Sequence, residues 1–128
     1  MRIEHIALNV AEPQAMAAWY LANLELRMAL EVPGAGYMAF LADDNDQTVL
    51  ELYHNPAAAV PDFASMSRYA FHIALVVDNI ESEIDRLVAA GGRLDCPIEN
   101  RDNGDRFGFV RDPWGVVLQL VERQTPLL

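Results

Sequence analysis

Two stretches of the chain are near copies: residues 3–10 read IEHIALNV, and residues 70–77 read AFHIALVV. A second pair follows a similar spacing, because VLEL at residues 49–52 recurs as VLQL at residues 117–120. The copies in the first pair are 67 residues apart, and those in the second are 68 apart. Similar segments that recur at one period indicate a duplicated supersecondary module.

Each copy carries a polar residue at a matched position of an otherwise apolar strand. These residues are His5 and His72 in the first pair, and Glu51 and Gln119 in the second. Imidazole nitrogens and carboxylate or amide oxygens are ligands of divalent metals. A lone histidine in a strand is often a hydrogen-bonded core residue, but here two of the three histidines share one register of the repeat. We therefore predict that the four residues bind one metal ion, with inherited core positions as the alternative.

The hydrophobic period predicts the same order in each half: one strand, one helix and three strands. The first half is predicted to contain strand 2–10, a helix from Pro13 to about Asn23, and strands 26–32, 37–42 and 48–54. The second is predicted to contain strand 69–77, a helix capped by Asp78 and ended by Gly91-Gly92, strands 93–95 and 106–111, and a last strand after the turn 112–115. We thus expect an α+β chain of two βαβββ modules, residues 1–54 and 69–123, joined by a connector at 55–68 within one domain, 1–128.

Strand alternation assigns each predicted metal ligand to a face. His5 shares a face with Ala7 and Asn9, while Ile6, Leu8 and Val10 point the other way and are expected to pack under the first helix. His72, Glu51 and Gln119 follow the same rule. The second helix is expected to bury Ile80, Ile84, Leu87 and Val88.

Composition excludes several classes of protein. Nine basic and nineteen acidic residues give a formal charge of −10, so we expect no nucleic-acid partner and no binding to acidic membranes. Cys96 is the single cysteine, which excludes an intramolecular disulfide. No apolar run approaches the ~18 residues of a membrane span, and a strand begins too close to Met1 for a signal peptide. A cytoplasmic location is expected.

The duplicated motifs resemble the vicinal oxygen chelate superfamily, which includes glyoxalase I, methylmalonyl-CoA epimerase, extradiol dioxygenases, and the fosfomycin and bleomycin resistance proteins. The resemblance covers nearly the whole chain. It rests on two HIAL segments, LEL around Glu51, Trp19-Tyr20 before Leu24, and Asp112-Pro113-Trp114-Gly115 followed by Leu118-Gln119-Leu120. It implies a cup-shaped eight-stranded mixed sheet with helices on the outer face, a metal in the cup, and commonly a homodimer.

The resemblance also implies a ligand set. Bacterial glyoxalase I has His, Glu, His and Glu at the four positions, so His5, Glu51, His72 and Gln119 are expected to hold a Ni, Zn, Mn, Mg or Fe ion. Gln119 departs from this pattern, because its amide is neutral and cannot act as a base. Glu51 is therefore the expected catalytic base. We expect a metal-dependent lyase or isomerase of the glyoxalase type, which chelates vicinal oxygens of a small substrate and transfers a proton through an enediolate.

Three other functions stay open at this point. Starting from the second module, the set becomes His, Gln, His and Glu, which resembles some methylmalonyl-CoA epimerases and suggests a CoA thioester. Two histidines and one carboxylate also form the ligand set of non-haem iron oxygenases, although dioxygenases of the family take the carboxylate from the fourth position. The last alternative is a non-catalytic drug- or ligand-binding protein of the resistance type.

Further residues are candidates for substrate binding. Asn9, Tyr53, Phe107 and Trp114 are expected to shape the pocket, with simple packing as the alternative. Arg106, with Arg101 nearby, lies in or near a segment resembling the family's substrate-covering loop and is expected to bind a carboxylate or a carrier group. A solvated surface role is the alternative for both arginines, and His54 is expected at the surface.

Overall fold

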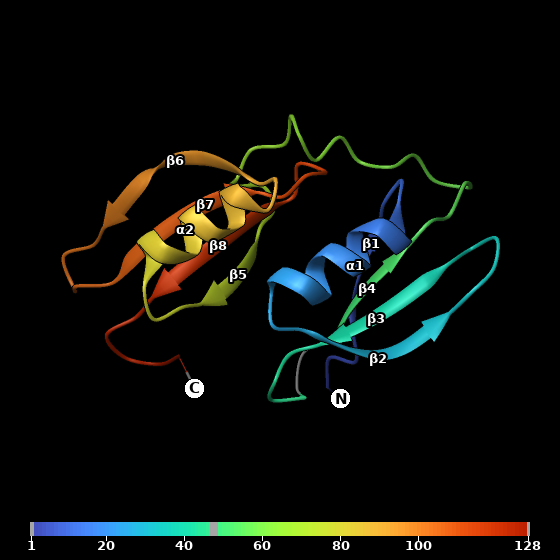
Figure 1. Cartoon of the computed structure of the whole chain (residues 1–128), viewed down its shortest axis with the longest axis horizontal. Helices are drawn as coiled ribbons and strands as arrows, with labels where there is room; N and C mark the ends of the chain where they lie inside the picture. Colours follow the sequence, from blue (N-terminus) through green and yellow to red (C-terminus); the bar gives the residue numbers. More distant parts are fainter. Residues whose placement is uncertain (1, 47–48, 128) are drawn as a thin grey trace. The chain divides into compact units, whose positions relative to one another are not determined.

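The computed structural model describes residues 2–46 and 49–127, and this part of the chain contains two helices and eight strands (Figure 1). The chain divides into two compact units, Met1–Pro61 and Asp62–Leu128. Each unit contains a strand, a helix and three further strands in that order. The predicted α+β fold of two βαβββ modules is therefore confirmed. Thr48, which begins a predicted strand, and the two terminal residues lie outside the described residues.

The first unit builds one four-stranded mixed sheet. Its elements are β1 (Ile6–Asn9), α1 (Pro13–Asn23), β2 (Arg27–Val32), β3 (Met38–Ala42) and β4 (Val49–Tyr53). The strand order is β1-β4-β3-β2, with β1 parallel to β4 and the other pairs antiparallel. The parallel pair needs a crossover, which α1 and the β2–β3 hairpin provide.

One face of this sheet packs against α1. The helix contributes Met16 and Tyr20, both fully buried, and the sheet contributes Leu8, Leu41 and Leu52, of which none is more than 4% exposed. Pro13 occupies the first turn of α1, where a missing N–H costs nothing. The opposite face, which we call the far face of the first sheet, therefore carries the residues that alternate with these leucines.

The second unit repeats the plan. Its elements are β5 (Ile73–Val76), α2 (Ile80–Ala89), β6 (Arg93–Asn100), β7 (Arg106–Arg111) and β8 (Val117–Glu122). The order is β5-β8-β7-β6, again with a parallel first pair and antiparallel remaining pairs. Figure 1 shows α2 lying over its own sheet as α1 lies over the first.

Helix α2 approaches its sheet closely at one glycine. A Cβ added at Gly108 would stand 2.9 Å from Ile80 Cγ2 and 3.1 Å from Ile84 Cδ1. Ile80, Ile84 and Leu87 form the buried stripe of the helix at the expected spacing. The face of the second sheet away from α2 is its far face.

Two predicted buried residues are exposed. Val88 is 41% exposed, because the stripe is complete at Leu87 and the next residue turns about 100° away from it. Ile6 is 48% exposed, since it begins an edge strand of the first sheet. The buried stripes are therefore narrower than predicted.

Several element boundaries also differ from prediction. Strands β1 and β5 begin at Ile6 and Ile73 rather than at residues 2 and 69, so His5 and His72 directly precede their strands instead of lying within them. The cap of α2 is Asn79, whose side chain accepts a hydrogen bond from Ser82 N at 2.9 Å, so the prediction of Asp78 is wrong. Strand β6 runs on to Asn100 rather than ending at Asp95. Its pairing with β7 shifts register twice, and these bulges hide the strand's alternation from the sequence. Among the described residues, no helix is long and apolar enough to cross a membrane.

Candidate functional site

The first sheet brings His5 and Glu51 together on its far face. Ala7, Glu51 and Phe40 are register partners across β1, β4 and β3, so they point to the same side. His5 directly precedes β1, and its side chain reaches the same side. Its Nε2 is 3.2 Å from Glu51 Oε2, and its ring meets Phe40 edge-on with centroids 5.6 Å apart. The Glu51 side chain is only 12% exposed.

The other ring nitrogen of His5 also has an acidic partner. Nδ1 donates to the Glu4 carboxylate, whose side chain is 80% exposed. This hydrogen bond is the main reason why the pKa of His5 lies above its ordinary value; the charges of Glu4 and Glu51 add to the effect, and desolvation opposes it. A histidine that donates from Nδ1 to a carboxylate presents the lone pair of Nε2 once that atom is deprotonated, as metal-binding histidines do.

The second sheet repeats this arrangement on its own far face. Ala74, Gln119 and Phe109 are register partners across β5, β8 and β7. His72 lies two residues before Ala74, as His5 does before Ala7. Its ring meets Phe109 edge-on, with centroids 6.2 Å apart. Gln119 is half-buried between apolar neighbours.

His72 differs from His5 in the partner of its second nitrogen. Its Nδ1 is 2.9 Å from the main-chain carbonyl oxygen of Arg68. A carbonyl oxygen can only accept, so Nδ1 carries the proton and Nε2 of the neutral ring keeps its lone pair. This is the tautomer that a metal bound at Nε2 requires.

The donor set fits a divalent metal ion. Two imidazole nitrogens, one carboxylate and one amide oxygen are donors that Zn²⁺, Ni²⁺ and Fe²⁺ accept. Each unit contains two of the four predicted ligands. Within residues 2–46 and 49–127, no three His, Cys, Asp or Glu side chains cluster closely enough to hold a metal. The assembly of all four donors around one ion therefore remains a prediction.

Two of the predicted substrate-binding residues lie near the end of the first sheet. Asn9 Nδ2 donates to the carbonyls of Asn55 and Ala58, at 3.2 and 3.1 Å, while its Oδ1 accepts from Asn55 N at 2.8 Å. These bonds hold the start of the connector. Tyr53 pairs with Asn9 across the sheet and is half-buried on the far face with Glu51.

The other three candidates belong to the second unit. Arg106 points to the α2 side of the second sheet, whereas Gln119 points to the far face. The Arg106 guanidinium binds the carboxylates of Glu81 and Glu122. It therefore joins α2 to the sheet. Phe107 is on the far face, two residues from Phe109, with the Arg101 and Arg123 guanidinium carbons 5.0 and 5.7 Å from its ring centre. Trp114 is half-buried in the turn after β7, where its main-chain N–H donates to Asp112 Oδ1 at 2.9 Å.

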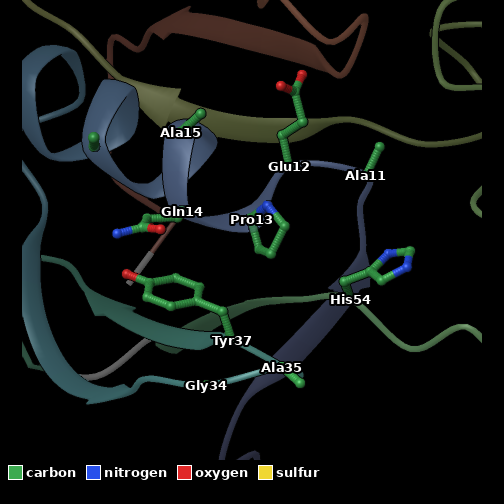
Figure 2. A pocket seen from close by; sticks show the side chains of 10 residues that line it. Ala11, Glu12, Pro13, Gln14, Ala15, Gly34, Ala35, Tyr37 and His54 are labelled. Carbon is green, nitrogen blue, oxygen red and sulfur yellow. The ribbon is translucent and has the colours of Figure 1, made fainter.

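A separate hollow of about 620 Å³ opens on the first unit beside the start of α1 (Figure 2). Ala11, Gln14, Tyr37 and His54 are among its lining residues. His54 is half-buried and donates from Nδ1 to the Val10 carbonyl at 3.0 Å, which corrects its predicted surface position. Burial, helped by a hydrogen bond to Glu31, raises the pKa of Tyr37 to about 12. The hollow includes neither His5 nor Glu51.

Sequence reasoning missed the groups that orient the two histidines. Phe40 and Phe109 stand in the short repeat Ala39-Phe40-Leu41 and Gly108-Phe109-Val110, 69 residues apart, so the repeat itself contained a signal for them. Glu4 and the Arg68 carbonyl had no such signal, because they occupy unrelated positions in the two modules.

A comparison with protein families decides the relationship. The family model described as Glyoxalase/Bleomycin resistance protein/Dioxygenase superfamily matches residues 2–120. The chain belongs to this superfamily. Its two βαβββ units are thus those of a glyoxalase-superfamily domain.

Individual members show how close the superfamily relationship is. A probable lactoylglutathione lyase from Vibrio cholerae serotype O1 is 29% identical over 96% of this chain and 91% of its own. A glyoxalase family protein from Bacillus cereus superposes with a TM-score of 0.78 at 17% identity, covering 95% of this chain and 93% of that one. A glyoxalase I variant from Zea mays gives 0.75 at 19% identity, covering 97% and 46%. The two structures establish the shared fold.

Proposed function

We propose that this protein is a metal-dependent lyase or isomerase of the glyoxalase type, with His5, Glu51, His72 and Gln119 as the ligands of one divalent ion. The observation that supports this most strongly is that each unit places a histidine ring against the phenylalanine that neighbours its second polar residue on the far face of the sheet. In both units the histidine ring stands edge-on to a phenylalanine that is the cross-strand partner of the second donor. Two equivalent half-sites are what a single metal held by duplicated modules requires.

The similarity to a probable lactoylglutathione lyase supports enzymatic activity on a small substrate. A hemithioacetal of glutathione and a 2-oxoaldehyde is therefore the first substrate to test. Phe107, on the same far face as Gln119, and Tyr53, on the same face as Glu51, are the residues we propose to contact it. A homodimer and a cytoplasmic location belong to the same proposal.

Glu51 has the chemistry of the base. When bound, the metal would stabilise negative charge on two adjacent substrate oxygens. Glu51 removes the proton from the hydroxyl-bearing carbon beside the substrate carbonyl and returns it to the former carbonyl carbon, while the hydroxyl proton passes to the former carbonyl oxygen, so the isomerisation needs no oxidant or reductant. Its low exposure keeps competing water away from the carboxylate. The amide of Gln119 is neutral, so it cannot act as the base in this proton transfer.

Metal content of single variants tests whether the two half-sites share one ion. The wild-type protein, loaded with Zn²⁺ and freed of excess metal, is expected to hold one ion per chain. His5→Ala and His72→Ala are each expected to lose nearly all of it, because each removes a ligand from the same ion. His54→Ala is the matched control and is expected to keep full occupancy, because His54 lines the separate hollow.

Other outcomes would point elsewhere. Two ions per wild-type chain, with one lost in each variant, would show that the half-sites act separately. Oxygen uptake with catechols on Fe²⁺-loaded protein would favour dioxygenase chemistry. Wild-type protein that neither retains Zn²⁺, Ni²⁺, Mn²⁺ or Fe²⁺ nor is stabilised by them would contradict the proposal and favour a ligand-binding role.

A further inference from the structure

Arg111 is a buried arginine on the far face of the second sheet, and its guanidinium is surrounded by acceptors. It is 8% exposed. Nε donates to Asp95 Oδ1 at 2.7 Å, and Nη2 donates to the Met66 carbonyl at 3.0 Å. Nη1 donates to the carbonyls of Phe63 and Gly115, at 2.9 and 3.1 Å. One side chain therefore holds three main-chain carbonyls and a carboxylate.

Two of those carbonyls belong to residues 63–68, a segment that we call the strap. Asp95 fixes the end of the strap as well, because its Oδ2 accepts from Arg68 Nη1 at 3.2 Å. Burial tends to raise the pKa of Asp95, but Arg111 and Arg68 outweigh it and hold the pKa below its ordinary value. Asp95 is thus a charged bridge between the arginine in β7 and the strap.

The strap also packs tightly against the turn that follows β7. A Cβ added at Gly115, whose φ is +90°, would stand 2.5 Å from Ala64 Cα. Any side chain at residue 115 would collide with the strap, so the turn and the strap pack main chain against main chain. The Arg68 carbonyl at the end of the strap is the acceptor for His72 Nδ1. Arg111 is therefore linked to His72 through a segment of main chain that is hydrogen-bonded at Phe63, Met66 and Arg68.

Among residues 2–46 and 49–61 of the first unit, no counterpart of this arrangement is found. Arg111 pairs with Val117 across its sheet, and the residue in the same place of the first sheet is Ala42, which pairs with Val49. His5 is held instead by the exposed side chain of its neighbour Glu4. In the described part of the chain, the strap contacts thus belong to the second half-site.

We propose that Arg111, together with Asp95, is a positioning residue for His72: it anchors the strap so that the Arg68 carbonyl fixes the His72 tautomer with Nε2 ready to bind a metal. The metal-binding part of this inference rests on the proposed function, whereas the effect on the tautomer does not. Arg111 itself touches no proposed ligand, so its effect passes through the strap.

The test uses Arg111→Lys, which keeps the positive charge but cannot make the same forked set of hydrogen bonds. In metal-free wild-type protein at pH 8, two-bond ¹H–¹⁵N spectra are expected to show His72 protonated only at Nδ1. In Arg111→Lys a mixture of the two tautomers is expected. Zn²⁺ affinity, measured by competition with a chromogenic chelator, is expected to fall about tenfold, the lower range for outer-shell partners of metal ligands.

Arg123→Lys is the matched control. Arg123, directly after β8, binds the buried Asp105 carboxylate, directly before β7, at 2.9 Å, and none of the contacts described for it reaches the strap. It is expected to leave both the His72 tautomer and the Zn²⁺ affinity unchanged. Asp95→Asn removes the charge of the bridge while keeping the side-chain size. It is expected to change the His72 tautomer and the Zn²⁺ affinity in the same direction as Arg111→Lys, but by a smaller amount. If Arg111→Lys does not fold, Asp95→Asn is the test.

A folded Arg111→Lys protein with a pure Nδ1–H tautomer and wild-type Zn²⁺ affinity would overturn the inference. If wild-type protein binds no metal while the tautomer still changes in Arg111→Lys, the proposed function fails and the positioning role stands. Equal effects of Arg123→Lys and Arg111→Lys would also overturn it, because they would show a general loss of stability.

Discussion

The two modules share a backbone plan, and the residues that differ between them determine what each sheet can do. The first sheet has Ala39, Ala42 and Glu51 where register places Gly108, Arg111 and Gln119 in the second. Fold and chemistry thus depend on different positions of the repeat. Leucines pack under each helix, while on the far face the second sheet has a neutral amide in place of a carboxylate and an anchored arginine in place of an alanine.

The largest expected effect comes from making both half-sites neutral. Glu51→Gln gives the first module the amide that the second has, and it removes the proposed base. Turnover is expected to fall by roughly 10²- to 10⁴-fold, as measured by initial rates on the active substrate with saturating metal. Glu31→Gln, on β2 of the same sheet, is expected to leave the rate unchanged. Turnover in Glu51→Gln within a few fold of wild type would require a different base.

The reverse substitution makes both half-sites acidic. Gln119→Glu adds a second carboxylate, and Zn²⁺ is expected to bind on the order of tenfold more tightly because of the added charge. Turnover of the glutathione hemithioacetal is expected to rise, since the ligand set becomes His, Glu, His and Glu. Chelator competition and initial rates measure the two effects. Unchanged affinity would mean that residue 119 is not a ligand.

Gly108 and Ala39 are equivalent positions under the two helices, and each can be replaced by the residue that the other sheet has there. Gly108→Ala introduces a methyl group against Ile80 and Ile84, and it is expected to lower the free energy of unfolding by about 1–3 kcal/mol. Ala39→Gly removes a methyl group at the equivalent position under α1 and is expected to cost about 1 kcal/mol. Urea unfolding measures both. Stabilisation by Gly108→Ala would show that α2 can move away from its sheet.

The smallest effect is expected at the start of α2, where a capping side chain is present. Asn79→Ala removes the hydrogen bond to Ser82 N and is expected to cost about 1 kcal/mol. Asp78→Ala, one residue earlier, is expected to change the free energy of unfolding less, because Asp78 does not cap the helix. Thermal unfolding of the two variants separates them. A larger loss of unfolding free energy in Asp78→Ala than in Asn79→Ala would show that Asp78 caps the helix, as the sequence predicted.

The sequence predicted the four proposed ligands because duplication and strand alternation are both local patterns. His5 and Glu51 lie 46 residues apart, and the repeat predicted that both lie on one face of the sheet, although His5 itself directly precedes β1. The full length of β6 escaped prediction, since Pro97 and two register shifts interrupt its alternation. The cap of α2 was misplaced by one residue because Asp78 and Asn79 are both good caps, and only the hydrogen bond to Ser82 separates them.

The amino-acid sequence by itself determined the two βαβββ modules, their superfamily features and the matched polar positions, because periodicity and repetition are properties of neighbouring residues. Only the tertiary structure decided how those positions are supported. The contact of Arg111 with Asp95, the strap that it anchors and the carbonyl that orients His72 join residues whose spacing has no pattern. Such contacts form between segments that are distant in the sequence, so the periodicity of neighbouring residues does not predict them.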